Sequence, residues 1–374
     1  MSAGVSLNRI NFTTIETSRS TLSPRQLGLS NELFLPLLNV TLVLDVVVAL
    51  FAILANIVTI SVYRKLGYAD SSNVSLTALA VSDLAVSLTT ITCVLAIVLP
   101  DVIPNAPFTH GIFVFISSNP HVNSTRVSAL ITAFISLERY LCVLVPLRVK
   151  SLITPKRTFK AMVVIFAIGH IGWFFDFAVY SIRWEFIPGL NRTVLNTVPA
   201  KHVTAVALRG FSQTYYSFFL PVLTFSIVLI CTFLLSASLH RNKEWRDANK
   251  RTSSNNAPAN RGADDPPSPT TESATPKSKE AKAIKMVITI STVFIIATIP
   301  ASIHMVAVVF VPGFDFGGRY VNLWILTGMT FLIIDCINCS ANVMIYYNMS
   351  SKFRTATREL FLGKGGISGN RLRK

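Results

Sequence analysis

The chain has 374 residues, of which 51% are hydrophobic and only 14% are charged. This composition is too apolar for an ordinary soluble domain and indicates a protein that is mostly dissolved in a lipid bilayer. The formal net charge of +16 at pH 7 makes a basic surface for nucleic acid the rival interpretation, which the positions of the charges must decide.

Seven apolar stretches follow one another along the chain. Each is long enough to cross about 30 Å of hydrocarbon as a helix that rises about 1.5 Å per residue. We therefore predict an all-α membrane protein with a seven-helix transmembrane domain over residues 37–347. The third stretch contains the polar segment SSNPHVNSTR with Pro120, so that helix is either kinked there or begins later. The predicted spans are residues 37–63, 74–100, 112–147, 160–183, 211–240, 283–311 and 320–347.

The Lys and Arg residues predict the orientation of this domain. Most of them lie after span one, after span three, between spans five and six, and after span seven. Because basic residues concentrate in cytoplasmic loops, we expect residues 1–36 to be extracellular and residues 348–374 to be cytoplasmic. The charge is then mainly a topology signal, and we expect no nucleic-acid partner. The sequons at Asn11 and Asn191 fall on the predicted outer side and are candidates for glycosylation.

The cysteines bear on the extracellular loops. All five lie inside apolar spans, so we expect no extracellular disulfide. They are Cys93, Cys142, Cys231, Cys336 and Cys339.

The sequence FISLERYLCVLVPLR puts Glu138, Arg139 and Tyr140 at the inner end of the third span. Together with seven predicted spans and an outer N-terminus, this motif resembles a G-protein-coupled receptor of the rhodopsin-like class. In that family an acidic residue followed by Arg and Tyr closes the third helix. The resemblance covers about residues 37–362.

The Glu138–Arg139 pair is interpreted as a switch. A charge at the rim of the membrane needs a counter-charge, and Glu138 supplies one locally. Glu280, at the inner end of span six where many family members have an acidic residue, is expected to supply a second. Breaking that second pair would free span six to swing outward, so the pair would act as a latch. The alternative is an ordinary interfacial pair in which Arg139 extends to water.

Polar side chains in the middle of the predicted bundle form a second group. Asp83 lies deep in span two, Ser128 lies in span three, and Asn338 and Asn342 lie in span seven. In the family such a set holds a sodium ion that favours the inactive state, and oxygen ligands of this kind suit a small hard cation. A hydrogen-bonded network without an ion is the other interpretation. We expect no other cofactor.

The segment between spans five and six, residues 242–279, is rich in Ser, Thr, Pro, Asn and charged residues. It cannot bury a core, so we predict a disordered third inner loop. Its hydroxyl groups are candidate sites for a receptor kinase, because phosphorylation adds negative charge that arrestin-like partners recognise. A plain spacer is the alternative interpretation.

Span seven ends in SANVMIYYNM, where the family has Asn-Pro-x-x-Tyr. Asn342 and Tyr346 are present and belong to the predicted switch, but Val343 replaces the proline and removes one source of a kink. Thr298 stands where the family has a tryptophan in span six. These departures put the usual activation relay in doubt. The following sequence, SSKFRTATRELF, predicts a short amphipathic helix on the inner leaflet.

Candidate ligand-binding residues lie toward the outer ends of the spans, with Trp184 and Glu185 over the mouth of the predicted pocket. A structural role is the alternative for each. His121 stands where amine receptors have an aspartate, and Cys336 stands where visual pigments have a lysine, so neither kind of ligand is expected. The candidates are His121, Asp176, Gln213, His304 and Asp335.

The resemblance implies a plasma-membrane receptor that binds an extracellular ligand and activates a heterotrimeric G protein, and it does not imply an enzyme. The motifs are most similar to the chemosensory receptors of gastropod molluscs, so a chemosensory cue is the expected ligand. A neuropeptide receptor of the same class is the alternative. A transporter or channel is the alternative from another class, but the sequence shows no internal repeat.

Overall fold

The computed structural model describes residues 29–103, 105–188, 191–200, 202–255, 276–314 and 318–363. Within these residues, seven helical segments are long and apolar enough to cross a membrane. Each corresponds to one predicted span, which confirms the seven-helix domain. They are α2 (Asn31–Leu66), α3 (Ser71–Val102), α4 (His110–Leu144), α6 (Pro155–Val179), the continuous run of α7 (Val203–Thr214), η2 (Tyr215–Phe219) and α8 (Leu220–Asn255), α9 (Pro276–Phe310) and α10 (Val321–Met349).

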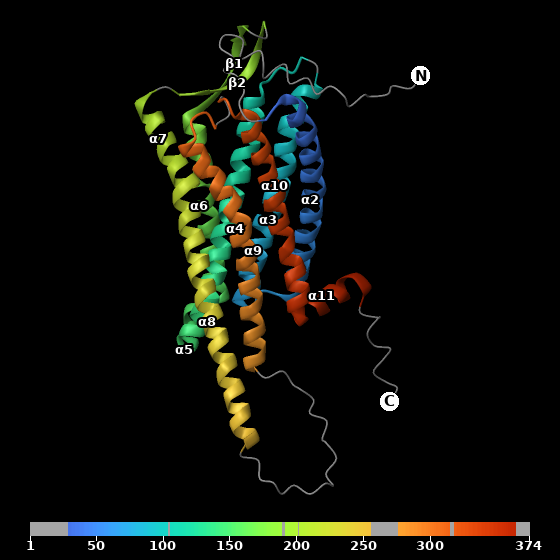
Figure 1. The fold of residues 1–374 in the computed structure, drawn as a ribbon, viewed down its shortest axis with the longest axis vertical. Helices are drawn as coiled ribbons and strands as arrows, with labels where there is room; N and C mark the ends of the chain where they lie inside the picture. Colours follow the sequence, from blue (N-terminus) through green and yellow to red (C-terminus); the bar gives the residue numbers. More distant parts are fainter. Residues whose placement is uncertain are drawn as a thin grey trace.

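The seven segments run side by side and form one bundle (Figure 1). α4 contacts α3, α6, α8 and α9, so it passes through the middle of the bundle. α10 packs against both α2 and α9 and so joins the first spanning helix to the sixth. Large apolar side chains on the outer faces are exposed, such as Leu54, Phe174 and Phe233. A continuous apolar surface of this kind suits lipid and not water.

A short helix, α11 (Ser351–Leu362), follows the last spanning helix and packs against α2. It lies at the end of the bundle opposite the β-strands, as does the short helix α5 (Pro146–Leu152) (Figure 1). Phe353 is 0% exposed, with its ring centroid 5.4 Å from that of Tyr63 and 5.6 Å from that of Tyr346. This aromatic cluster ties the first and last spanning helices together.

The third spanning helix, α4, continues through the polar segment 117–126 and contains Pro120. Of the two possibilities for this span, the later start is therefore wrong. Polar side chains of the segment, such as those of Ser117 and Asn123, are buried inside the bundle. Because they face other helices and not lipid, the low hydropathy of the segment is compatible with a membrane-spanning helix.

A β-hairpin that we did not predict connects α6 to α7. The fourth span was predicted to reach residue 183, but α6 ends at Val179 and β1 (Tyr180–Ile187) follows, paired antiparallel with β2 (Arg192–Pro199). The aromatic and β-branched residues in YSIRWEFI raise the hydropathy of the span but also favour a strand. The Pro, Gly and Asn residues in the intervening sequence PGLN were the available signal for a hairpin.

Backbone hydrogen bonds attach this hairpin to the start of α4. The Leu195 N–H donates to the Pro107 carbonyl oxygen at 2.7 Å, and the Leu195 carbonyl oxygen accepts from the Thr109 N–H at 3.0 Å. The Thr109 hydroxyl also donates to Asn196 Oδ1 at 2.9 Å. The five cysteines form no disulfide and lie within the spanning helices. Hydrogen bonds, and not a disulfide, therefore hold the hairpin in place.

Helices extend into the segment that we predicted as a disordered loop over residues 242–279. α8 continues to Asn255 and α9 begins at Pro276, so the prediction is wrong at both ends of the segment. Residues 256–275 lie outside the described residues. Charged residues such as Glu244 and Lys250 have good helix propensity, so a helix can continue beyond the apolar span without an apolar face.

Candidate functional site

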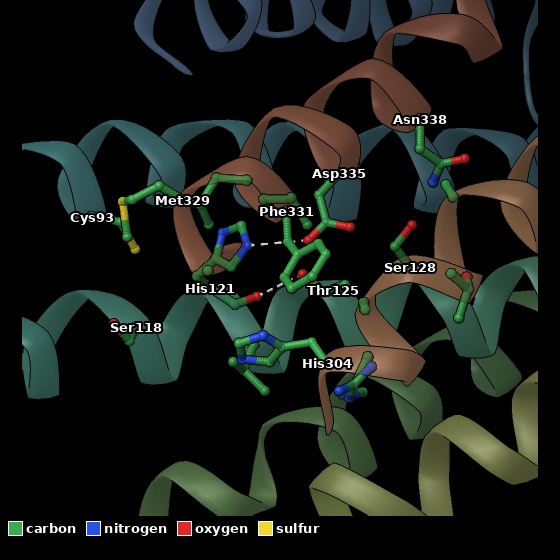
Figure 2. Close-up of a pocket in the computed structure, with 18 of the residues that line it drawn as sticks. Cys93, Ser118, His121, Thr125, Ser128, His304, Met329, Phe331, Asp335 and Asn338 are labelled. Carbon is green, nitrogen blue, oxygen red and sulfur yellow. Dashed lines mark hydrogen bonds and ion pairs between the residues drawn. The ribbon is translucent and has the colours of Figure 1, made fainter. Parts of the chain in front are cut away.

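A cavity of about 320 Å³ lies between α3, α4, α8, α9 and α10 (Figure 2). This volume is at the lower end of the range for small-molecule sites. Three of the five predicted ligand-binding residues share the cavity. Most of the lining is apolar, and the charged and polar side chains that reach it include His121, Thr125, Arg126, His304 and Asp335.

The other predicted residues lie elsewhere or are not described. Asp176 is on α6 and Gln213 is on α7, but both side chains are outside those that the structure describes. Trp184 and Glu185 are on β1, in the hairpin at one end of the bundle (Figure 1). Their proposed place over the mouth of the pocket stays a prediction.

His121 and Asp335 point toward each other from α4 and α10 (Figure 2), with Nε2 and Oδ2 3.4 Å apart. Their side chains are 7% and 24% exposed. The other ring nitrogen, Nδ1, lies 3.2 Å from the Thr89 hydroxyl on α3. That hydroxyl also donates to the Ala85 carbonyl oxygen at 2.8 Å. The network joins three helices at the wall of the cavity.

His304, on α9, packs among aromatic rings. Its Nδ1 is 3.0 Å from the Thr327 hydroxyl on α10. The His304 ring centroid is 5.0 Å from that of Phe331 and 5.2 Å from that of Phe314. These contacts fix the imidazole in one orientation, so His304 forms a rigid part of the wall between α9 and α10.

Arg126, which the sequence analysis did not select, lies on α4 and lines the cavity. Its Nε–H donates to the Tyr216 carbonyl oxygen at 2.9 Å. Tyr216 lies in the π-helical turn η2, where the Leu220 N–H donates to the Tyr215 carbonyl oxygen. The next residue, Pro221, has no N–H, so the Tyr216 carbonyl oxygen accepts from Arg126 instead. The sequence feature that could have identified Arg126 was an arginine within an apolar span. It was missed because the start of that span was undecided.

Asp83 is 0% exposed, and both of its carboxylate oxygens accept hydrogen bonds. The Ser128 hydroxyl donates to Oδ1 at 2.6 Å, and Asn342 Nδ2 donates to Oδ2 at 2.8 Å. The structure thus brings together three of the four predicted residues. Asn338 lines the cavity, and no hydrogen bond joins it to Asp83 among the described residues. These oxygen ligands fit a sodium ion, but the network is also complete without an ion.

The Glu138–Arg139 pair lies at the end of α4, against the first turn of α3. The Glu138 side chain is 1% exposed and accepts hydrogen bonds from the Ser71 hydroxyl at 2.8 Å and the Ser75 hydroxyl at 3.3 Å. Arg139 Nη2 is 3.3 Å from Glu138 Oε1 and also donates to the Ser72 hydroxyl. The pair is therefore present and is bonded to the neighbouring helix.

The other predicted switch residues belong to the same end of the bundle. Tyr140 packs against the inner apolar core. The ring centroids of Tyr346 and Tyr63 are 5.7 Å apart, and the buried Tyr346 hydroxyl has no hydrogen-bond partner among the described residues. Glu280 is on α9, but its side chain is outside those that the structure describes. Its contact with Arg139 therefore stays a prediction.

Comparison with known families agrees with this arrangement. The family model described as 7 transmembrane receptor (rhodopsin family) matches residues 54–346, well over half of the 374 residues. The match begins within α2 and ends within α10, so it takes in the five spanning segments between them. No curated protein matches the chain with significant similarity. The extent of the family match shows that this chain belongs to the rhodopsin family of seven-transmembrane receptors.

Proposed function

We propose that this protein is a plasma-membrane receptor that binds a small extracellular molecule in the cavity and activates a heterotrimeric G protein. The family consists of receptors and not of enzymes, which supports an extracellular ligand and coupling to a G protein. The observation that carries the proposal is that the wall of the cavity includes Ser128, which hydrogen-bonds Asp83. Asp83 in turn accepts from Asn342, so a ligand in the cavity acts on a network that extends along α10.

A chemosensory cue fits this cavity better than a neuropeptide does. The volume of about 320 Å³ suits a small molecule, and the similarity of the sequence motifs to gastropod chemosensory receptors supports the same choice. A neuropeptide would instead have to lie mainly over the hairpin, where Trp184 and Phe186 are exposed. This second candidate predicts loss of response when those two side chains are removed.

The proposed orientation puts the hairpin outside the cell and α11 inside. Asn191 is an exposed residue in the hairpin turn, with φ of 48°, so its amide is accessible for glycosylation. Asn11 lies outside the described residues. On α11, Phe353 is buried while Phe361 and Leu362 are exposed, as expected for a helix with an apolar edge in the inner leaflet.

The proposed switch uses the inner end of α4. Arg139 is held by Glu138 and by Ser72, so activation requires it to leave at least one of these partners. The latch with Glu280 belongs to the same proposal. Receptor kinase and arrestin are proposed to act on the Ser- and Thr-rich segment between α8 and α9.

A sodium ion beside Asp83 is also part of the proposal. Asp83, Ser128, Asn338 and Asn342 would hold it, and the bound ion would supply the positive charge that stabilises the inactive arrangement. Any effect of sodium concentration on signalling should then disappear in Asp83→Asn, which keeps an acceptor oxygen but loses the negative charge.

The experiment that tests the receptor function is basal GTP exchange on co-expressed G proteins, compared for wild type, Glu280→Ala and Arg139→Ala at matched surface levels. We expect exchange to rise with Glu280→Ala and to be abolished when Arg139→Ala is added. Glu185→Ala, on the hairpin, is the control and should leave exchange unchanged. No difference among these proteins across a broad panel of G proteins would contradict the proposal.

A further inference from the structure

The cavity contains the guanidinium group of Arg126, and only part of this group has described hydrogen-bond partners. Arg126 lines the cavity, and its Nε–H is bonded to the Tyr216 carbonyl oxygen. Across the part of the chain that the structure describes, no hydrogen bond or ion pair engages its two terminal nitrogens. A guanidinium stays charged in proteins, and an unpaired charge within a membrane-spanning segment is costly. The site therefore has a place for an anion.

Nearby acidic groups of the chain do not fill this place. Asp335 also lines the cavity, but its Oδ2 faces His121 at 3.4 Å. Both oxygens of Asp83 are engaged by Ser128 and Asn342. Asp335 is near enough to interact electrostatically with Arg126, but among the described residues no ion pair joins Arg126 to either aspartate. A counter-ion from outside the chain would complete the set of partners.

We propose that the cavity binds a small organic carboxylate with Arg126 as its anchor, an inference that rests on the proposed receptor function and names its class of ligand. A guanidinium offers parallel N–H donors that match the two oxygens of a carboxylate. The Nε–H is fixed by Tyr216, which restricts the plane of the group and leaves its terminal N–H groups for the ligand.

The other residues that line the cavity favour a ligand with one negative charge and an otherwise apolar structure. Ala301, Met305 and Leu332 are typical of the wall, and such side chains gain free energy when hydrocarbon replaces water against them. Asp335 on the same wall repels a second negative charge. A monocarboxylate therefore fits this cavity, whereas a phosphate with two charges and three acceptor oxygens does not.

Gly328 on α10 sets how much of the ligand body the cavity accommodates. It lines the cavity, and a Cβ atom added there would meet no other atom within 4 Å. The Cβ atom of a larger side chain would therefore enter open space, and we expect the rest of that side chain to occupy part of the cavity. Gly328→Leu is thus a way to reduce the cavity while the anchor stays in place.

The experiment measures thermal unfolding of the purified full chain in lipid nanodiscs. The probes are monocarboxylic acids of about three to ten carbon atoms, chosen for a small cavity, with the primary amide and the amine of each skeleton. We expect one or more acids to raise the unfolding midpoint in a saturable way. The matching amide should bind about 100-fold more weakly, because it loses a charge-assisted hydrogen-bonded pair.

Substitutions test whether Arg126 is the residue that binds the carboxylate. Arg126→Gln should abolish the acid-induced shift, and Arg126→Lys should retain part of it, because the charge stays but the planar fork is lost. Arg183→Gln removes an exposed positive charge on the hairpin, where the side chain is 59% exposed, and should leave the shift unchanged. Gly328→Leu should weaken binding of the longer acids more than that of the shortest.

Three results would each overturn the carboxylate proposal: no shift with any acid, equal binding of an acid and its amide, or an undiminished shift in Arg126→Gln. If Arg126→Gln does not fold, the acid and amide comparison on wild type and the Gly328→Leu series decide the matter. The measurement needs no G protein. Acid binding without G-protein activation would contradict only the receptor function, and basal activation without acid binding would contradict only the carboxylate.

Discussion

The end of the bundle at α11 and the cavity satisfy their charged groups to different extents. At the α11 end, Glu138 accepts hydrogen bonds from two serine hydroxyls and from Arg139, all supplied by the chain. In the cavity, Arg126 has a described partner only at Nε, and Asp335 is paired with His121 at 3.4 Å. The comparison indicates that the end of the bundle at α11 satisfies its charged groups from within the chain, whereas the cavity has room for the proposed carboxylate.

The largest expected effect is on the aromatic cluster of the α11 end. Phe353→Ala should lower the free energy of unfolding by about 3–5 kcal/mol, because the ring is fully buried between Tyr63 and Tyr346. Phe361→Ala, on the same helix but 66% exposed, is the matched control. Denaturant titration in detergent micelles measures both, and a negligible loss with Phe353→Ala would mean that α11 does not stabilise the bundle through this ring.

A smaller effect is expected at the charged pair. Glu138→Gln removes the negative charge that Arg139 and two serines share, at a cost of about 1.5–3 kcal/mol for a hydrogen bond to a charged group. Because Arg139 then loses its ion pair with residue 138 and keeps the hydrogen bond to Ser72, basal GTP exchange should rise at matched surface expression. Unchanged exchange together with lowered stability would make the pair purely structural.

A close contact between α6 and η2 involves Tyr216, the residue whose carbonyl oxygen accepts from Arg126 in the cavity. Gly172 lies against the ring of the buried Tyr216, so that a Cβ atom would clash with it. Gly172→Ala should therefore cost about 1–3 kcal/mol of stability through overpacking. Gly210→Ala, on α7, meets no atom within 4 Å and should be neutral or slightly stabilising. Thermal unfolding distinguishes them, and a tolerated Gly172→Ala would mean that Tyr216 moves freely.

The smallest expected effect concerns the pair in the cavity wall. A double-mutant cycle of His121→Ala and Asp335→Ala should give a coupling free energy of about 1 kcal/mol in thermal or chemical unfolding. With Asp335 24% exposed, the interaction should be weaker than the one at Glu138, whose side chain is 1% exposed. A coupling free energy near zero would show that the two side chains act independently, which would sharpen the contrast between the cavity and the Glu138 end, whereas a coupling as strong as that at Glu138 would remove it.

The membrane-spanning helices could be predicted from the sequence. A membrane-spanning chain must satisfy its backbone internally, so long apolar runs become helices, and all seven were identifiable. Asp83, Ser128 and Asn342 were also predicted together, because each stands at a position where the family resemblance implies a shared polar pocket. The hydrogen bonds at 2.6 and 2.8 Å agree with that prediction.

The parts that could not be predicted depend on tertiary packing. Arg126 was missed because the path of the third helix across Pro120 was undecided, and only a helix that continues through it places this side chain against the cavity. The hairpin was missed because its first strand is apolar enough to extend a span. Its attachment depends on Leu195 meeting Pro107 and Thr109, which are far away in sequence.

The attachment of the hairpin by hydrogen bonds determines how the receptor responds to reducing and oxidising conditions. The hairpin is joined to α4 through the backbone of Leu195 and the side chains of Thr109 and Asn196, and the five thiols lie in the spanning helices. A reducing agent such as dithiothreitol therefore has no covalent link to break here. Folding, purification and ligand assays should proceed equally well in reducing and oxidising buffers, and expression should not depend on the machinery that oxidises secreted proteins.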